Sequence, residues 1–267
     1  MTMRWVGSAV LAAVLLLAGL GFATSAAADP PAPPGTPTAT SFAGTPTVGP
    51  LFRNGLENRH GCTASVLASP RHDLILTAAH CVSGTAAGWL FAPGYNGGAT
   101  PYGVWTVTRA YVSPQWIADQ DPQHDFAILQ VAHQRRGNRT VGVEDVTGGN
   151  LLGVAPRPGQ RIEDVAYNSG VNDQPIHCAV SVYYTDGFPG FNCHGYVGGS
   201  SGSPWLYRVA GTHLTFVVGV IGGLHQGGCY EYTSYSSAFG PDGYRLLLRA
   251  VLGLHPDTVP TAGGDGC

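Results

Sequence analysis

Residues 77–81 read TAAHC, and this stretch decides how the chain folds. It joins a short apolar run, residues 73–77, to His80 and Cys81. A second run of the same kind, residues 62–67, lies a few residues before it. Short apolar or β-branched runs bounded by turn residues indicate β-strands. His80 is therefore predicted to lie at the end of a strand.

The same pattern continues through most of the chain. Residues 104–112 roughly alternate apolar and polar side chains, as a half-buried strand does. Other short apolar runs, separated by turns, lie at residues 125–131, 161–167, 177–184, 203–209 and 213–221. Gly 39 and Pro 20 are high counts for a helical protein and suit many short strands joined by turns. The sequence predicts an all-β body of two units.

One segment reads as a helix, near residues 242–252. Asp242 can cap its first turn, and Gly253 follows its last one. The apolar side chains that helical spacing brings to one face are Tyr244, Leu247, Leu248 and Val251. We therefore expect a single C-terminal helix after the β-body.

The composition excludes several classes of protein. Hydrophobic residues make up 44% of the chain and charged residues 11%, which argues against general disorder. The formal net charge is −3, so nucleic acid is not expected as a partner. No HExxH or CxxC spacing indicates a metal site, and we expect no metal and no cofactor.

The N-terminus resembles an export signal. Arg4 supplies a positive charge, residues 9–20 form an apolar run, and residues 26–28 are three alanines. We expect a signal peptide over residues 1–28, so that the mature chain is secreted and leaves the membrane. An uncleaved membrane anchor is the alternative, but no stop-transfer pattern follows. Residues 29–47 are rich in Pro, Ala and Thr, and we expect a linker or a pro-segment without its own core.

Two further motifs follow TAAHC in the chain. Residues 124–129 read HDFAIL, and residues 198–204 read GGSSGSP. Together the three resemble the chymotrypsin-like serine peptidase family, in which histidine, aspartate and serine stand in such motifs in this order. The gap between Asp125 and Ser201 is short for the animal trypsins. It is more similar to the compact bacterial branch that includes the glutamyl endopeptidases.

The resemblance implies a fold for the two units. We expect two antiparallel six-stranded β-barrels of the chymotrypsin-like type. Residues 48–145 would form the N-terminal barrel with His80 and Asp125. Residues 146–267 would form the C-terminal barrel with Ser201, the helix and a polar tail.

The residue chemistry agrees with the family pattern. A serine hydroxyl is a weak nucleophile and needs a base within hydrogen-bond reach, a task that imidazole suits near neutral pH. A buried carboxylate holds the tautomer of that imidazole. Ser201 is therefore the expected nucleophile, His80 the general base and Asp125 the orienting acid. The resemblance places an oxyanion hole at the backbone amides of Gly199 and Ser201.

Neighbouring residues compete for two of these roles. Asp121 could replace Asp125, but the strand expected after the motif follows Asp125. Ser200 or Ser203 could be mistaken for Ser201, but the Gly-x-Pro that follows favours Ser201. A G-x-S-x-G hydrolase motif is excluded because its final glycine is missing. The chain order His, Asp, Ser is also the reverse of the order in that fold.

All six cysteines lie after the expected signal, and an even number in an exported chain indicates three disulfides. By resemblance Cys62 pairs with Cys81, and Cys178 is expected to pair with Cys193. Cys229 would then pair with Cys267. A Cys193–Cys229 pair, similar to the trypsin bridge across the specificity pocket, remains the main alternative, because sequence alone does not settle connectivity.

The chain departs from the animal enzymes at three positions. Ser200 replaces the aspartate that binds the new N-terminus after zymogen cleavage, so we expect no such ion pair. Gly195 replaces the aspartate that selects basic residues in trypsins. His225, in a segment similar to one in the glutamyl endopeptidases, is expected to line the pocket and to favour Glu or Asp before the scissile bond. An ordinary loop histidine is the alternative.

These expectations lead to one main function and two alternatives. The main one is a secreted, monomeric serine endopeptidase that cleaves a polypeptide substrate through an acyl-enzyme. The first alternative is a non-catalytic, peptide-binding homologue, since a protease fold need not cleave anything. The second is an esterase, or a protease restricted to one partner.

Overall fold

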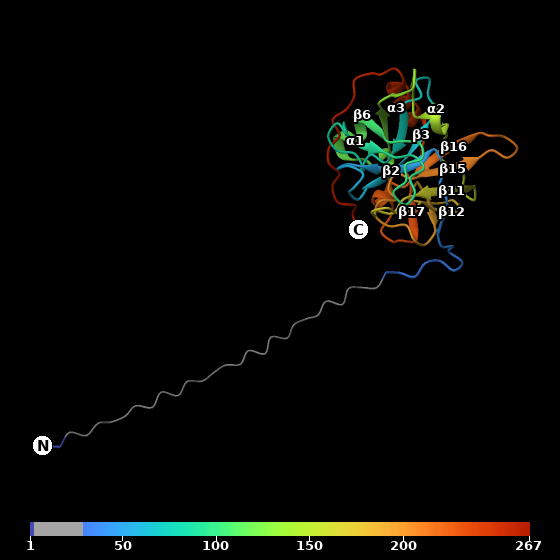
Figure 1. The fold of residues 1–267 in the computed structure, drawn as a ribbon. Helices are drawn as coiled ribbons and strands as arrows, with labels where there is room; N and C mark the ends of the chain where they lie inside the picture. The colour runs from blue at the N-terminus through green and yellow to red at the C-terminus, as the bar shows by residue number, and fades with distance from the viewer. Residues whose placement is uncertain (3–28) are drawn as a thin grey trace. The chain divides into compact units, whose positions relative to one another are not determined.

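The predicted β-body is present in the computed structural model, which describes residues 1–2 and 29–267 (Figure 1). The signal-peptide prediction lies almost wholly outside these residues. Residues Ala32–Cys267 form one compact unit, and the folded elements all belong to it. Among the described residues, none of the helices has both the length and the apolar character needed to span a bilayer.

Six strands close into an antiparallel barrel in the first half of the chain, in the order β2-β3-β4-β7-β6-β5. They are β2 (Val48–Phe52), β3 (Cys62–Leu67), β4 (Leu74–Thr77), β5 (Leu90–Phe91), β6 (Trp105–Val112) and β7 (Ala127–Val131). Every residue of β2, β3, β4 and β7 is buried. One face of these strands fills the barrel and the other is covered, which is why they read as continuous apolar runs. The first expected barrel is therefore present.

The expected second barrel is not confirmed, because the strands of the second half form two separate sheets. A six-stranded sheet has the order β1-β12-β11-β15-β16-β10, and a separate three-stranded sheet has the order β13-β14-β17. The strands are β1 (Thr40–Ser41), β10 (Leu151–Leu152), β11 (Arg161–Ala166), β12 (Ile176–Ser181), β13 (Tyr183–Thr185), β14 (Phe188–Asn192), β15 (Pro204–Arg208), β16 (Thr215–Val220) and β17 (Thr233–Tyr235). Strands β1 and β10 are the two edges of the larger sheet.

The N-terminal segment is part of this sheet rather than a free linker. Thr40 and Ser41 pair with β12, and Phe42 stacks on His177 with ring centroids 4.4 Å apart. The N–H of Ala39 donates to the carbonyl of His194 at 2.9 Å. Strand pairing therefore begins before Val48, where the sequence places the start of the fold.

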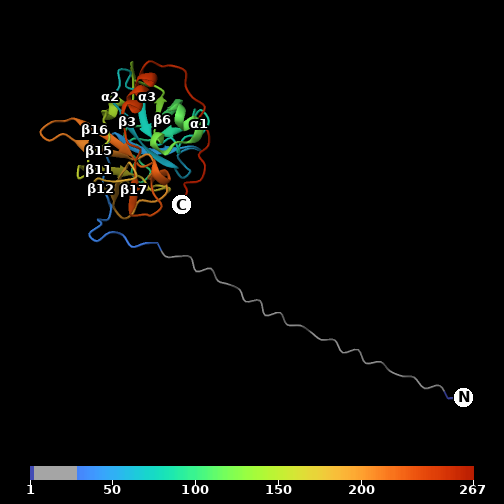
Figure 2. The same ribbon diagram turned by 180° about the vertical axis from the view of Figure 1, so that it is seen from behind.

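The helices are short except for the last one. They are α1 (Pro114–Asp119), α2 (Glu144–Thr147) and α3 (Pro241–Val251), with 3₁₀ turns η1 (Pro122–His124) and η2 (Leu224–Gly227). A small hairpin joins β8 (Gln134–Arg136) and β9 (Arg139–Val141). Figure 1 shows α3 beside β6, at the opposite end of the unit from β12 and β17. The hairpin between β15 and β16 extends outward in both views (Figures 1 and 2).

Helix α3 buries only part of the expected face. Leu247 and Val251 are partly buried and pack against the core, whereas Tyr244 is 45% exposed and Leu248 56% exposed. The fully buried residues of the helix are Gly243, Leu246 and Ala250, and the helix lies against β6 and β7. Asp242 does not cap the helix either. It lies inside the first turn and pairs with Arg245 and His124.

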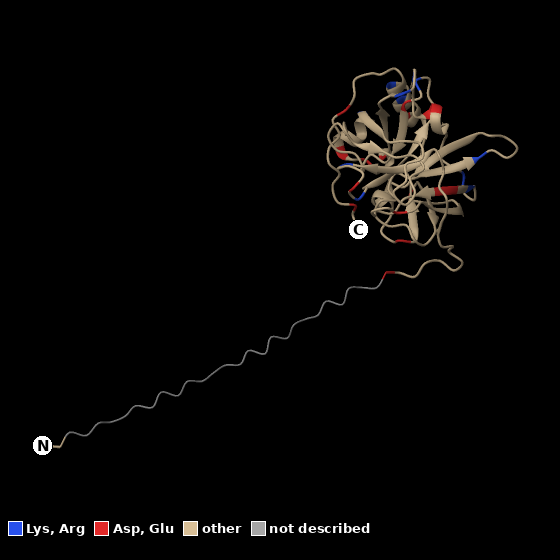
Figure 3. Cartoon of the chain, in the orientation of Figure 1, with Lys and Arg blue, Asp and Glu red and all other residues tan. Residues whose placement is uncertain are grey.

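Three disulfides tie the unit together. They join Cys62 to Cys81, Cys178 to Cys193, and Cys229 to Cys267, which are the pairs expected from the sequence. The second bridge links β12 of the larger sheet to the residue after β14 of the smaller one. The third holds the C-terminal tail. Charged side chains are few and of mixed sign over the unit (Figure 3).

Candidate active site

His80 follows directly after β4, where the buried residues Ala78 and Ala79 anchor the turn. The disulfide between Cys62 and the neighbouring Cys81 fixes this turn to β3. The His80 side chain is 9% exposed. His80 is therefore held in position by the buried end of β4 and by the disulfide of the neighbouring Cys81.

Asp125 holds His80 at two points. Its Oδ2 lies 2.7 Å from His80 Nδ1, and its Oδ1 accepts the backbone N–H of His80 at 2.8 Å. Oδ2 also accepts the N–H of Gly223 at 2.8 Å. This buried carboxylate only accepts hydrogen bonds when ionised, so Nδ1 carries a proton. In the neutral imidazole, Nε2 is then free to accept a proton.

Asp121, the competing carboxylate, lies elsewhere. Its Oδ2 is 2.8 Å from His124 Nδ1, and its Oδ1 accepts the N–H of Gln123 at 2.9 Å. The structure therefore places Asp125, and not Asp121, against His80.

The loop that contains Ser201 and Gly202, here the nucleophile loop, packs against the N-terminal barrel. The N–H of Thr63, in β3, donates to the carbonyl of Ser201 at 2.8 Å. Gly202 has a φ of +79°, and a Cβ there would lie 2.1 Å from Thr77 Oγ1 and 2.4 Å from the Thr63 carbonyl oxygen. Only glycine fits this contact. The position of Ser201 thus depends on both halves of the fold.

Two backbone amides of this loop are unpaired in the described chain. Within the described chain, neither the Gly199 N–H nor the Ser201 N–H donates a hydrogen bond. Both residues line a cavity of about 430 Å³ together with His80. Unpaired amides at a cleft are the groups that stabilise a developing negative charge on oxygen. In the described residues Ser201 Oγ and His80 Nε2 are not hydrogen-bonded, and such contacts often tighten only when substrate binds.

A family comparison bears on this arrangement. The model of the trypsin-like peptidase domain matches residues 62–220, which is more than half of the chain. The chain belongs to this family. Membership classes it with the serine-type peptidases, and the matched region includes His80, Asp125 and Ser201.

Solved structures of other proteases have a fold similar to that of this trypsin-like peptidase. The protease Anisep from Arthrobacter nicotinovorans has a TM-score of 0.65 and 22% identity, covering 80% of this chain and 100% of its own. A thermostable serine protease, AL20, from an extremophilic microorganism has a TM-score of 0.62 and 22% identity, covering 78% and 98%. A Glu endopeptidase has a TM-score of 0.60 and 20% identity, covering 82% and 98%.

One curated relative matches a short part of the peptidase. It is an extracellular metalloprotease of Bacillus subtilis (strain 168), 33% identical over 76 residues. The match covers 27% of this chain and 23% of the relative, so the chain spans about a quarter of that protein's length.

The surroundings of His225 and Gly195 in the peptidase differ from those that the sequence predicts. His225 does line the cavity, but its Nδ1 is 3.0 Å from the carbonyl of Asp265, in the C-terminal tail. Gly195 is not among the lining residues. Its N–H donates to Glu231 at 2.6 Å, and its carbonyl accepts from Asn168. The tail therefore forms part of the wall near His225.

Charged residues that the sequence analysis missed also line the cavity, namely Arg53, Glu231 and Asp265. Partial burial raises the pKa of Glu231, but hydrogen bonds from His194 and from the Gly195 N–H outweigh it and leave that pKa below its usual value. Burial lowers the pKa of Arg53. The one sequence signal for Asp265 is Cys267, whose disulfide to Cys229 brings the tail to the cleft.

Two groups of possible metal ligands occur in the described residues. One contains His80 with Cys62 and Cys81, and the other contains His225 with Cys229 and Cys267. The cysteines of both groups are disulfide-bonded. They lack the thiolate that binds a metal ion, so these groups do not fit a metal centre.

Proposed function

We propose that this chain is a secreted serine endopeptidase that hydrolyses peptide bonds through an acyl-enzyme. The observation that carries the proposal is the pair of hydrogen bonds that His80 donates to Asp125, beside a cavity that Ser201 also lines. A carboxylate that fixes the imidazole tautomer next to a serine is the arrangement that activates a hydroxyl.

The reaction follows from these positions. Ser201 Oγ attacks the scissile carbonyl carbon, and its proton passes to His80 Nε2. The N–H groups of Gly199 and Ser201 bind the oxygen that becomes negative. The protonated His80 gives its proton to the leaving amine, and an ester to Ser201 remains. A water molecule, deprotonated by His80, then hydrolyses the ester and releases the acid.

For the substrate, we propose that His225 favours an acidic residue before the scissile bond. The Asp265 carbonyl accepts a hydrogen bond, so Nδ1 of His225 carries the hydrogen and Nε2 remains as the second ring nitrogen. Nε2 binds a carboxylate strongly only when protonated. Glu231 and Asp265 line the same cavity and oppose such a substrate. A panel of fluorogenic peptides that differ in the residue before the scissile bond tests this preference.

Export is supported by the disulfides, which persist in oxidising compartments. The curated relative, an extracellular protein, agrees with this location.

The decisive experiment is labelling by an organophosphonate, which forms a bond only with an activated serine. We expect stoichiometric labelling of the folded chain, abolished by Ser201→Ala. Ser200→Ala is the matched control, because the Ser200 hydroxyl donates to the Val197 carbonyl at 2.8 Å and faces its own loop. Folded wild-type protein that does not label would favour the non-catalytic homologue. Labelling with ester cleavage but no cleavage of a peptide library would favour an esterase.

A further inference from the structure

The peptide bond between Gly198 and Gly199 determines whether the proposed oxyanion hole exists. In a planar trans peptide, the C=O and the N–H point in opposite directions. The Gly198 carbonyl accepts the N–H of Ser169 at 2.6 Å. The Gly199 N–H, on the other side of the same peptide plane, therefore points away from Ser169. The contact with Ser169 sets the direction of the amide.

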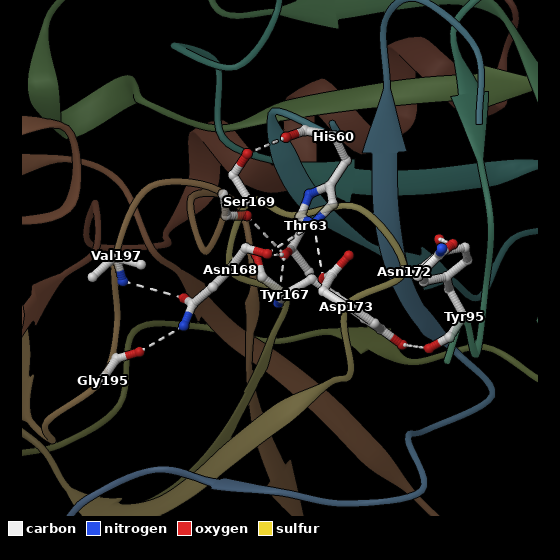
Figure 4. A network of polar contacts seen from close by, with 11 residues as sticks. His60, Thr63, Tyr95, Tyr167, Asn168, Ser169, Asn172, Asp173, Gly195 and Val197 are labelled. Atoms are coloured by element: carbon white, nitrogen blue, oxygen red, sulfur yellow. Dashed lines mark hydrogen bonds and ion pairs between the residues drawn. The ribbon is translucent and has the colours of Figure 1, made fainter. Parts of the chain in front are cut away.

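Residues 167–169, which we call the bracket, lie beside this loop (Figure 4). A Cβ at Gly199 would lie 2.2 Å from the nitrogen of Ser169, so the two backbones are in direct contact. The Asn168 side chain donates to the Gly195 carbonyl at 2.8 Å and accepts the Val197 N–H at 3.2 Å. The bracket thus holds the loop before the nucleophile at several points.

His60 holds the bracket in turn. Its Nε2 lies 3.0 Å from the Asn168 carbonyl oxygen and 3.0 Å from Asp173 Oδ2. Both are acceptors, so Nε2 carries a hydrogen and donates to them. The Ser169 hydroxyl donates back to the His60 carbonyl at 2.9 Å. One buried ring therefore connects Asp173 to the bracket.

The surroundings of His60 make this connection rigid. The residue is 1% exposed, and the rings of Phe52 and Tyr167 meet it edge-on. Tyr167, the first bracket residue, donates its O–H to the Tyr95 carbonyl at 2.7 Å. Asp173 Oδ1 is buried and has no partner in the described chain, and within that part of the chain His60 is the only side-chain donor to this carboxylate. The His60 side chain is fully buried and that of Asp173 is 16% exposed, so removing Asp173 would leave the buried ring without this partner.

The nucleophile loop gains little support from its own polar side chain. The Ser200 hydroxyl donates to Val197, within the loop. The support from outside comes from the bracket and from Thr63, whose hydroxyl donates to the Gly199 carbonyl at 3.0 Å. Thr63 Oγ1 also accepts the N–H of Tyr167 at 3.0 Å, so Thr63 joins the loop to the bracket.

We propose that His60 and Asp173 are positioning residues for the oxyanion hole. The contact between His60 and Asp173 holds residues 167–169, and these residues turn the Gly199 N–H toward the cleft. The inference rests on the proposed function, since it assigns a purpose to an amide of that catalytic site. It also gives the loop a support from within the chain, so that no ion pair with an N-terminus formed by zymogen cleavage is needed.

The test compares Asp173→Ala with Asp73→Ala in the full chain. Asp73 is a matched control: it is 1% exposed, accepts from Gln130 at 2.7 Å, and also has a buried Oδ1 without a partner. It lies beside β4 and contacts no residue of the bracket. We expect Asp173→Ala to lower kcat by about 10- to 100-fold with KM nearly unchanged. The pH midpoint of activity should stay, because His80 and Asp125 are untouched. Asp73→Ala should keep kcat within about three-fold of wild type.

Two further variants separate positioning from stability. Asp173→Asn keeps an acceptor for His60 and should restore most of kcat. Asn168→Ala cuts the link to Gly195 and Val197 without emptying the buried site, and should lower kcat by about ten-fold. Asn168→Ala still tests the positioning role if Asp173→Ala does not fold. Wild-type kcat per folded molecule in Asn168→Ala, or an equal loss in Asp73→Ala, would overturn the proposal.

Amide hydrogen exchange distinguishes failure of this inference from failure of the proposed function. In Asp173→Ala we expect faster exchange over residues 195–203, and unchanged exchange over β7. Unchanged exchange over residues 195–203 would overturn the positioning role even in an active enzyme. A wild-type chain that is not labelled by the phosphonate would overturn the proposed function. Faster exchange in that case would still show that the pair controls the loop.

Discussion

The two halves of the molecule hold their functional groups in different ways. The N-terminal half is a closed barrel in which four of the six strands are buried along their whole length, and it carries His80 and Asp125 close to a strand end and a strand start. The C-terminal half is two open sheets, and its nucleophile loop is held by segments from elsewhere in the chain. The proposed general base is therefore fixed by the barrel itself. The proposed nucleophile and oxyanion amides depend on contacts with residues that are distant in sequence.

The largest effect is expected within the closed barrel, from Asp125→Asn. The amide would still fill the site, but its N–H₂ group would favour the wrong tautomer of His80. We expect kcat to fall by about 10⁴-fold, with little change in thermal stability. Peptide hydrolysis and a thermal melt of the same sample provide the measurement. Asp121→Asn is the control and should stay close to wild type, because Asp121 bonds His124 and not His80. An equal loss in both variants would contradict the assignment of Asp125.

The next effect is expected at the junction between the halves, from Gly202→Ala. The added Cβ would meet Thr77 and Thr63, and the residue would be held at a φ of +79°. Backbone strain of this kind costs about 1–3 kcal/mol, and the steric overlap adds to it. We expect a marked loss of thermal stability, and loss of activity at temperatures where the chain remains folded.

Gly211→Ala is the matched control for that prediction. Gly211 has a φ of +75°, but a Cβ there would meet nothing within 4 Å, since it lies in the exposed hairpin between β15 and β16. This variant carries the strain without the overlap and should remain active. A Gly202→Ala enzyme as active and stable as Gly211→Ala would show that the nucleophile loop does not need its contact with the barrel.

A smaller effect is expected at the edge of the open sheet, from truncation of the N-terminal segment. A chain starting at Thr36 keeps β1, whereas one starting at Gly44 lacks it. Without β1, the edge of β12 and the carbonyl of His194 lose their backbone partners. We expect the shorter chain to melt at a lower temperature and to have a higher KM, because His194 precedes the residues that line the cleft. A gain of activity in the shorter chain would instead identify residues 29–47 as an inhibitory pro-segment.

The difference between the halves also explains what the sequence could and could not predict. TAAHC, HDFAIL and GGSSGSP are local motifs, so His80, Asp125 and Ser201 could be named without a structure. The strand β1 could not be predicted, because Thr40 and Ser41 stand in a Pro-rich segment without strand periodicity. Their pairing depends on the edge of β12, more than a hundred residues away.

The support of the active site was hidden for a similar reason. His60 stands in no motif, and its role depends on Asn168 and Asp173, which are 108 and 113 residues away in the chain. The place of the C-terminal tail at the cleft could be predicted only from the pairing of Cys267. The sheet edges formed by β1 and β10 could not be predicted, because two-residue strands give almost no sequence signal.

The smallest effect is expected inside the larger sheet, at Asp164 in β11. This carboxyl is fully buried, and Ser203 Oγ lies 2.8 Å and 3.1 Å from its two oxygens. Burial raises the pKa of Asp164 well above its ordinary value, despite the hydrogen bond from Ser203. The folded chain therefore keeps the proton at pH values where the unfolded chain has lost it. Stability linked to this group is fully present below the ordinary Asp pKa of about 4 and is lost as the pH rises toward the folded pKa.

Asp164→Asn tests this linkage, because the amide is neutral at every pH and nearly the same shape. We expect the melting temperatures of variant and wild type to differ by a constant amount below about pH 4. Above that pH the difference should move in favour of the variant, by an amount on the order of a few degrees by neutral pH. Ser203→Ala, read in the same series, reports the loss of the hydrogen bond without loss of the ionisable group, so its difference from wild type should change much less with pH. A pH-independent difference for Asp164→Asn would mean that Asp164 is ionised in the folded chain, and that the open sheet tolerates a buried charge next to the nucleophile loop.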